Sequence, residues 1–205
     1  MSEPRFIHLR THTAYSLLEG AIHVKALPGL ARAAGMPAVA VTDSNNLFCA
    51  LEFAEKAAAE GVQPIIGCQL ALAFAAAPPG GRTPDPAPLV LLAQSEAGYR
   101  NLMALSSRAY LDAAGGLAHV DLATLCGHAD GIICLSGGAE GPLGKLIAAG
   151  KTAEAEALSG RLEAAFADRY YIEIQRHGPN NQGRIPAEEA TEPALVALAY
   201  ARDLP

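Results

Sequence analysis

Short apolar runs alternate with longer, Ala-rich segments along most of this chain. The apolar runs predict strands at 6–9, 38–42, 64–74, 89–93, 131–136 and 170–175. The segments between them predict helices at 24–34, from Asn45 or Asn46 to about residue 60, and at 96–111, 140–149, 152–166 and 188–202. Strands that alternate with helices are typical of an α/β fold with a parallel sheet.

Six such strands can form either an open doubly wound sheet or a (β/α) barrel. A dinucleotide-binding sheet carries a glycine fingerprint after its first strand, but this chain has "HLRTHTAYSLLEG" at 8–20 instead. The sequence therefore favours a barrel, in which functional side chains lie at the carboxyl ends of the strands. The stretch 75–88 is rich in Pro and Gly and predicts a loop.

The composition fits one soluble globular domain of 205 residues. Its 15 Lys and Arg against 21 Asp and Glu give a formal net charge of −6, so the chain is expected to bind nucleic acid poorly by itself. No apolar stretch reaches membrane-spanning length, and Arg5, His8 and Arg10 interrupt any signal peptide. We therefore expect a cytoplasmic protein without membrane contact. The four cysteines lack CxxC spacing and are expected to be reduced core thiols.

Polar side chains follow the predicted strands at their carboxyl ends. They include Arg10 and His12 after the first strand, Asp43 and Ser44 after the second, Gln69 in the third, and Arg176 and His177 after the sixth. A metal ion that activates water is usually held by three or more imidazole, carboxylate or thiolate groups. Only His12, Glu19, Asp43 and His177 are strong candidates, which allows at most one weakly held divalent ion.

Each candidate ligand also has a simpler structural interpretation. His12 is compatible with a hydrogen-bonded pocket position, Asp43 with a carboxylate that orders a loop, and His177 with a residue that orders a turn. Arg10 adds a permanent positive charge where a cation would bind. We hypothesise that Arg10 forms a salt bridge with Asp43 or Glu19.

Five segments, in their order and spacing, carry a resemblance to a known family. They are "RFIHLRTHTAYSLLEGA", "MPAVAVTDSNNLFCALEFAEKAAAEGVQPIIGCQL", "LVLLAQSEAGYRNLMALSSRAY", "GIICLSGG" and "RYYIEIQRHG". Together they resemble the PHP (polymerase and histidinol phosphatase) domain found at the N-terminus of bacterial DNA polymerase III alpha subunits. The resemblance covers essentially the whole chain.

The resemblance implies a distorted (β/α)7 TIM-like barrel, formed by residues 1–205 as a single domain of a longer polymerase chain. The last barrel strand would follow Pro205. The polymerase regions that use Mg²⁺ and contact most of the DNA would lie outside this chain. The chain itself is then expected to have no catalytic activity of its own and to need no cofactor.

Active members of the family hold a metal cluster that supports phosphoester hydrolysis, and the resemblance assigns its ligand positions here. Arg10 stands at the first histidine of a His-x-His motif, of which His12 is kept. Ser44 stands at the histidine of an Asp-His pair, of which Asp43 is kept. Gln69 stands where active members have a glutamate, so the side chain at this position keeps the shape of glutamate but loses its charge.

The remaining positions continue this pattern. Pro88 stands at a histidine, Gly138 at a cysteine and Glu19 at a position usually held by aspartate, whereas His177 is unchanged. The resemblance therefore implies a vestigial metal site without hydrolytic function.

The resemblance also implies partners. Polymerases whose site has degenerated in this way typically rely on a separate exonuclease subunit, epsilon, which docks on this domain, and we expect epsilon and the remainder of the alpha subunit as partners. The alternative is a metal-dependent phosphoesterase or 3'-5' exonuclease with a reduced site of His12, Glu19, Asp43 and His177. A third possibility is a stand-alone phosphatase of the same superfamily.

Overall fold

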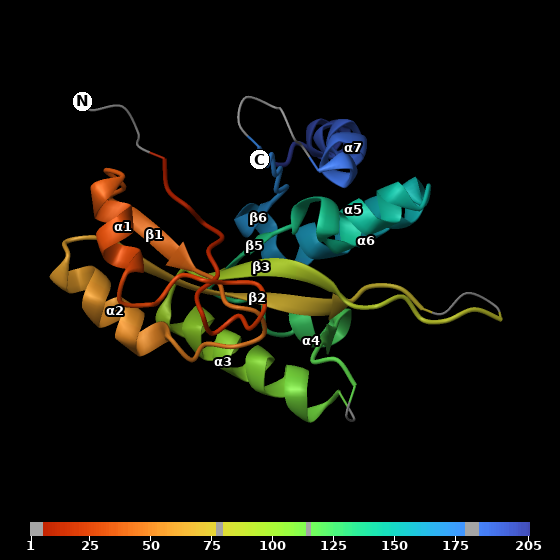
Figure 1. Cartoon of the computed structure of the whole chain (residues 1–205). Coiled ribbons are helices and arrows are strands. Elements are labelled where there is room, and N and C mark those ends of the chain that lie inside the picture. Colours follow the sequence, from red (N-terminus) through yellow and green to blue (C-terminus); the bar gives the residue numbers. More distant parts are fainter. Residues whose placement is uncertain (1–5, 77–79, 114–115, 179–184) are drawn as a thin grey trace.

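The computed structural model describes residues 6–76, 80–113, 116–178 and 185–205 as a mixed α/β structure (Figure 1). Its elements are α1 (Leu27–Ala33), β1 (Ala38–Val41), α2 (Ala50–Ala59), β2 (Gln63–Ala73), β3 (Ala87–Ala93), α3 (Glu96–Leu111), β4 (Val120–Asp121), α4 (Leu122–Cys126), β5 (Ile132–Leu135), η1 (Gly138–Glu140), α5 (Pro142–Ala148), α6 (Thr152–Phe166), η2 (Ala167–Arg169), β6 (Tyr170–Tyr171) and α7 (Pro186–Arg202). In the predicted loop at 75–88, residues 77–79 lie outside the described residues, and β3 already begins at Ala87.

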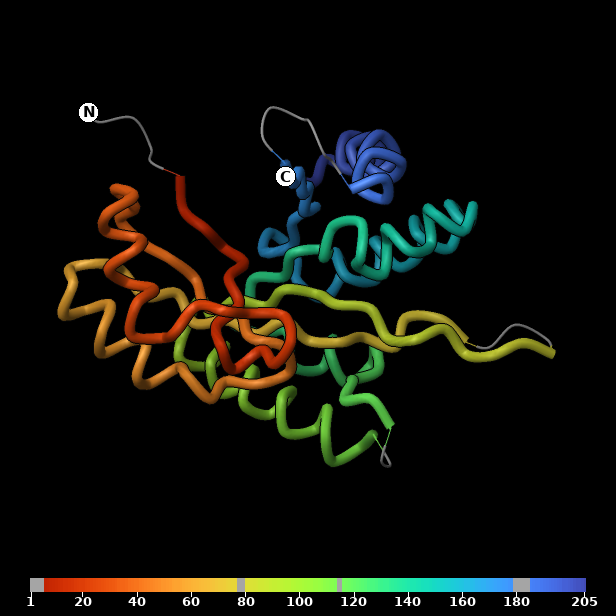
Figure 2. The backbone as a smooth tube through the Cα atoms, in the orientation of Figure 1, coloured from red at the N-terminus to blue at the C-terminus, as the bar shows by residue number. Residues whose placement is uncertain are grey.

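Within the described residues, the strands form one mixed sheet in the order β1-β2-β3-β5-β6, with β4 paired to β2. The long strand β2 pairs in parallel with β1 through 63–66 and antiparallel with β3 through 67–72. β5 is antiparallel to β3 and parallel to β6. The connection from β2 to β3 contains no helix in its described part, and such direct connections join antiparallel strands (Figure 2). For this reason the sheet is not purely parallel.

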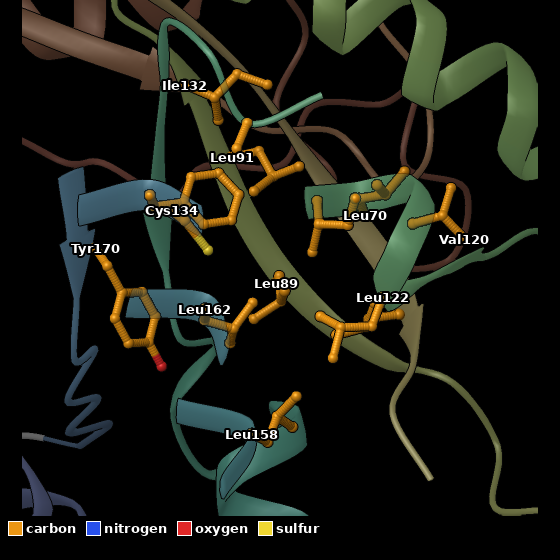
Figure 3. Packing of buried hydrophobic residues seen from close by; sticks show 14 of the residues in the cluster. Leu70, Leu89, Leu91, Val120, Leu122, Ile132, Cys134, Leu158, Leu162 and Tyr170 are labelled. Carbon is orange, nitrogen blue, oxygen red and sulfur yellow. The ribbon is translucent and has the colours of Figure 1, made fainter. Parts of the chain in front are cut away.

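Both faces of the central strands are apolar, and Figure 3 shows the large core on one of them. Leu89 and Leu91 of β3 belong to a large core, whereas Val90 and Leu92 of the same strand turn to the other face. This split follows from the alternation of side chains along a strand, and it explains why the sequence of β3 is continuously apolar. The large core takes its helical side chains from α3 to α7, among them Leu102, Leu105, Leu125, Leu143, Leu158, Leu162, Phe166 and Leu195.

The α/β class is confirmed, but a closed (β/α)7 barrel is not. In the described part of the chain the sheet is open between β1 and β6. Helices of the large core pack on one face of the sheet, and a small apolar cluster of Ala40, Val90, Leu92 and Leu135 lies on the other. In a closed barrel every strand pairs with a neighbour on both sides. In the described residues the two-residue strand β6 pairs with the strand β5 and stands at the end of the strand order opposite β1, so the sheet does not close.

The first predicted strand, at 6–9, is not a regular strand in the structure. The segment nevertheless runs along β1, where Ala40 N donates to His8 O at 2.8 Å and Thr42 N donates to Thr11 O at 2.9 Å. Between these two hydrogen bonds the N-terminal segment advances by three residues, from His8 to Thr11, whereas the opposite strand advances by two, from Ala40 to Thr42. The N-terminal segment therefore contains one additional residue that interrupts the ladder, as in a β-bulge. The irregular stretch contains Arg10.

Most predicted helices are confirmed, and α3 and α6 keep their predicted bounds. The predicted cap of α2 was wrong, because the helix begins after Cys49 and Asn46 instead donates to Tyr15 O at 3.2 Å. The sequence pattern also missed β4 and α4, which are too short to show a period. Among the four free cysteines, Cys126 is half-buried and the others are buried. No helix in the described part of the chain is long and apolar enough to cross a membrane.

Candidate functional site

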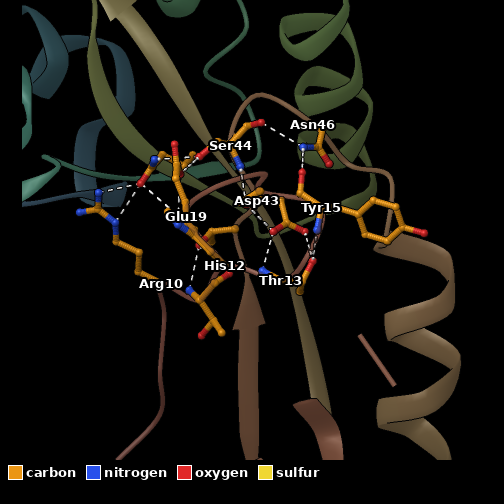
Figure 4. A network of polar contacts seen from close by, with 12 residues as sticks. Arg10, His12, Thr13, Tyr15, Glu19, Asp43, Ser44 and Asn46 are labelled. Carbon is orange, nitrogen blue, oxygen red and sulfur yellow. Dashed lines mark hydrogen bonds and ion pairs between the residues drawn. The ribbon is translucent and has the colours of Figure 1, made fainter. Parts of the chain in front are cut away.

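The candidate site lies at the carboxyl end of β1, where the N-terminal segment meets the middle of β2 (Figure 4). Ser44 and Gln69 form an isolated parallel bridge, and Gln69 N donates to Asp43 O at 3.1 Å. This pairing extends the β1–β2 ladder beyond its regular end. It brings the side chains of Ser44 and Gln69 into contact with the network that contains Arg10 and His12.

The guanidinium of Arg10 is the centre of this network. Its Nε and Nη2 donate to Gln69 Oε1 at 3.0 and 2.6 Å. Its Nη1 donates to Glu173 Oε1 at 3.2 Å and to Gly137 O at 3.4 Å. The side chains of Arg10 and Glu173 are only 18% and 11% exposed, so this charge-assisted contact is weakly screened by solvent. Arg10 therefore links the N-terminal segment, β2, the chain after β6 and the turn before η1.

His12 uses both of its ring nitrogens within the network. Its Nε2 lies 3.2 Å from Gln69 Oε1, and its Nδ1 lies 3.3 Å from Glu19 Oε2. Ser44 Oγ donates to Glu19 Oε2 at 2.5 Å and accepts from Gln69 Nε2 at 3.0 Å. A metal ion would have to displace these contacts before His12 or Glu19 could serve as a ligand.

Asp43 is buried, with 2% of its surface exposed, and orders the loop at 13–20. Its Oδ1 accepts from Thr13 N and Ser16 Oγ, both at 2.6 Å. Its Oδ2 accepts from Thr13 Oγ1 at 2.7 Å and from Cys49 Sγ at 3.2 Å. Burial, together with the neighbouring Asp43 carboxylate, raises the pKa of the Cys49 thiol, so this thiol stays protonated and able to donate. The four contacts explain Asp43 as a structural anchor.

The hypothesis that Arg10 pairs with Asp43 or Glu19 was wrong. Asp43 and Glu19 are occupied by donors of their own, and Arg10 pairs with Glu173 instead. Sequence reasoning missed Glu173. The available signal was the alternation in "YYIEIQ", which places Glu173 and Gln175 on one side of an extended segment.

Pro88 and Gly138 approach the site without offering a side-chain ligand. Pro88 pairs with Ala71 in the β2–β3 ladder, and its carbonyl oxygen would lie 2.1 Å from a Cβ placed on Gly137. Gly138 has a φ of +63°, and a Cβ there would lie 2.9 Å from Gln175 Oε1. A cysteine at position 138 would therefore meet both an unfavourable φ and crowding.

His177 binds a different partner from His12. Its Nδ1 is in hydrogen-bond contact with Glu188 Oε1, and its backbone N donates to Glu188 Oε2 at 3.0 Å. Glu188 is buried in the first turn of α7, where the helix dipole favours a negative charge. The pair therefore connects the chain after β6 to the start of α7.

An open cavity of about 720 Å³ lies beside the network. Arg10, His12 and His177 contribute to its polar lining, and Leu27 and Leu30 of α1 contribute to its apolar lining. Its size and mixed character are typical of small-molecule and cofactor pockets.

The residues proposed for a reduced metal site are not assembled into one. Of that set, His12 and Glu19 are in contact, whereas Asp43 and His177 bind the partners described above. No group of three or more His, Cys, Asp and Glu side chains is placed to hold a metal ion in the described ranges.

Comparison with protein families identifies the class of this domain. The sequence profile of the PHP domain family matches residues 8–177. The chain belongs to the PHP domain family, as its motifs predicted.

The chain is also similar to a set of larger bacterial proteins. It is 47% identical over 201 residues to the DNA polymerase III subunit alpha of Caulobacter vibrioides (strain NA1000 / CB15N), a match that covers 98% of this chain and 17% of that protein. It is 38% identical to the subunit of Treponema pallidum (strain Nichols) over 214 residues, covering 100% of this chain and 17% of that protein. The chain thus spans about 17% of the length of these curated relatives.

Solved structures resemble the fold at low sequence identity. A protein described as a metal-dependent phosphoesterase from Bifidobacterium adolescentis aligns with a TM-score of 0.53 at 14% identity, covering 97% of this chain and 83% of the other. An amidohydrolase from Chromobacterium violaceum, with bound sulfate and no metal, aligns with a TM-score of 0.50 at 14% identity, covering 94% and 96%. Likeness at this level supports the fold alone.

Proposed function

We propose that this chain is the PHP domain of a bacterial DNA polymerase III alpha subunit and acts in DNA replication, in the cytoplasm, as part of that longer polypeptide. The observation that carries the proposal is 47% identity over 98% of the chain to one such subunit. The test is primer extension with Mg²⁺ and deoxynucleotides. The natural-length polypeptide should extend a primer, whereas residues 1–205 alone should not. A natural-length polypeptide without template-directed synthesis would overturn the proposal.

Within that polypeptide, we propose that the domain is structural and that its former metal site is vestigial. The residues present do not fit a metal cluster, because Arg10 places a permanent positive charge among the positions that the family resemblance assigns to metal ligands. Its guanidinium instead donates to Gln69 Oε1, Glu173 Oε1 and Gly137 O, and these contacts join four segments that are distant in sequence. No hydrolytic step is assigned to this site.

Hydrolysis by the domain can be tested directly. A labelled single-stranded oligonucleotide is incubated with the natural-length protein and Mn²⁺ or Zn²⁺, and with a His12→Ala variant as the matched control. Equal background rates in both proteins support a structural domain. Metal-stimulated hydrolysis that disappears in the variant would instead establish the reduced phosphoesterase site.

We also propose that the domain docks the epsilon exonuclease subunit, as the family resemblance implies. A polymerase whose PHP site lacks a metal cluster requires proofreading from elsewhere, and this need supports a separate exonuclease. The natural-length alpha subunit should bind purified epsilon in a pull-down, and deletion of residues 1–205 should abolish the binding. Unchanged capture by the deletion variant would place the docking surface outside this domain.

We further propose that the sheet is completed to a distorted (β/α)7 barrel by a strand from the longer polypeptide. Two observations support this. Ile172 N donates to Pro205 O at 2.9 Å, so the chain after α7 already lies beside β6. The open cavity beside it is lined by residues of the N-terminal segment, including His8 and Thr11, which a closing strand would approach. A structure of the natural-length protein tests this directly.

A further inference from the structure

A second cavity, of about 300 Å³, lies between the end of α5 and the connection from β2 to β3, and its lining residues differ from those of the cavity beside Arg10. Figure 1 shows the described parts of this connection as an arm that projects beyond the end of the sheet. The apolar lining comes from Phe74 and Pro84 of the arm and from Leu146 and Ala149. Phe74 packs against the large core and Leu146 is buried, so this wall is anchored in the fold.

The cavity also carries a positive charge that the domain itself does not neutralise. Lys145 of α5 is half-buried, lines the cavity and forms no ion pair with any described residue. The carboxylates that line the cavity or contact its lysines are already engaged, because Asp85 lies 2.9 Å from Arg82, and Glu154 lies 3.0 Å from Lys151. One positive charge is therefore left over, in a chain whose formal net charge is −6. A half-buried ammonium group of this kind favours an anionic, hydrogen-bonding ligand such as a carboxylate.

The backbone of the arm beside the cavity is available for hydrogen bonds. The β2–β3 ladder ends at the pair of Leu72 and Ala87, and β4 pairs with β2 only as far as Ala73. Beyond these pairs, the peptide groups of Ala75 and Asp85 form no backbone hydrogen bond within the part of the chain that the structure describes. An extended peptide can use such groups for main-chain hydrogen bonds while its side chains enter an adjoining cavity.

We infer that this cavity binds an extended segment of another protein in which an apolar residue stands next to an acidic one. The apolar side chain packs against Phe74 and Leu146, the carboxylate pairs with Lys145, and the main chain of the segment pairs with the free peptide groups of the arm. A single surplus positive charge is too little for nucleic acid, whose binding relies on several phosphate contacts. The site uses none of the vestigial metal-site residues, so it goes beyond the proposed function.

The test is the selection of phage-displayed random heptapeptides on the immobilised natural-length polypeptide. The recovered peptides should share an apolar residue with a neighbouring Asp or Glu. Synthetic copies of them, followed by fluorescence anisotropy, should bind a Lys145→Glu variant about tenfold more weakly than the native protein, because their carboxylate then meets a like charge. Lys56→Glu is the matched control, since Lys56 is exposed on α2, and it should bind the peptides as tightly as the native protein does.

A second pair of variants leaves the lysine in place. Ala149→Glu adds a carboxylate to the lining and should also weaken binding, whereas Ala148→Glu, at the neighbouring exposed position outside the lining, should not. Thermal unfolding checks that all variants are folded. Recovery of no peptide above background, peptides without an acidic residue, or equal binding to both members of either pair would overturn the inference. A single-stranded oligonucleotide that binds the native protein but not Lys145→Glu would assign the lysine to nucleic acid and overturn it as well.

Discussion

Arg10 and Gln69 meet through a single oxygen atom, because Nε and Nη2 of the guanidinium both donate to Gln69 Oε1, at 3.0 and 2.6 Å. The same oxygen lies 3.2 Å from His12 Nε2. In the family resemblance, position 69 holds a carboxylate and position 10 a histidine. A glutamine amide that accepts from an arginine is consistent with a site that carries its own positive charge. The first and the last of the predictions below follow from this relationship.

Replacing Arg10 by Met should lower the free energy of unfolding by about 2–3 kcal/mol, because Glu173 is then left mostly buried without its positive partner. The measurement is urea denaturation followed by circular dichroism. Arg32→Met is the matched control, since Arg32 forms an exposed pair with Glu60 and should lose at most about 1 kcal/mol. Equal losses in the two variants would show that the Arg10–Glu173 pair contributes no more to stability than an exposed pair.

Replacing Asp43 by Ala should cost about 3 kcal/mol, since it leaves several donors of the 13–20 loop without an acceptor in a buried place. The loop should also loosen. Hydrogen exchange should show faster exchange at Thr13 and Gly20, while the amides of α3 are less affected. Asp85→Ala, at an exposed side chain, is the control and should leave exchange unchanged. Unaltered protection of Thr13 would contradict an anchoring role for Asp43.

Replacing Gly20 by Ala should destabilise the domain by more than about 2 kcal/mol, because the new Cβ would overlap backbone atoms of Thr13 and His12. Gly29→Ala is the control. Position 29 lies within α1 and has no neighbouring atom within 4 Å of a new Cβ, so alanine there should stabilise by up to about 1 kcal/mol. Thermal unfolding distinguishes the two outcomes, and a tolerated Gly20→Ala would show that the turn is loosely packed.

Asp121 should make a pH-dependent contribution to stability. The backbone N of Thr124 donates to its Oδ1 at 2.7 Å and lowers the pKa of Asp121 below its ordinary value of 3.8. Because the folded pKa is depressed, the contribution is present above the unfolded value and is lost as pH falls through the folded one. Asp121→Ala should therefore cost about 1 kcal/mol at neutral pH, with a smaller loss below pH 3.8. Asp121→Asn, which keeps a neutral cap, should show little pH dependence in its difference from Asp121→Ala.

The parts of the fold that could be predicted are those with a long hydrophobic period. α3 and α6 have complete apolar faces, and their bounds match the prediction. β4 and α4 could not be found, because two and five residues are too few to display a period. The apolar run at 6–9 suggested a strand, but the additional residue opposite β1 is visible only in the pairing itself. The antiparallel direction of β3 could have been inferred from the helix-free loop before it.

The sequence predicted which residues form the site better than it predicted the contacts between them. Arg10, His12 and Gln69 do meet, as the strand-end argument expected. The partner of Arg10 could not be predicted, because the choice between Glu173 and the nearer carboxylates depends on which oxygens other donors already occupy. The anchoring role of Asp43 likewise depends on loop contacts that have no sequence period.

The central claim is that Arg10 and its neighbours replace a metal cluster. The most direct test is metal content by elemental mass spectrometry after dialysis against Zn²⁺ and Mn²⁺. The native protein is compared with an Arg10→His, Ser44→His, Gln69→Glu variant that restores three ligand types. We predict substoichiometric metal in the native protein and increased metal in the variant. One or more tightly held ions in the native protein, lost on His12→Ala, would contradict the claim.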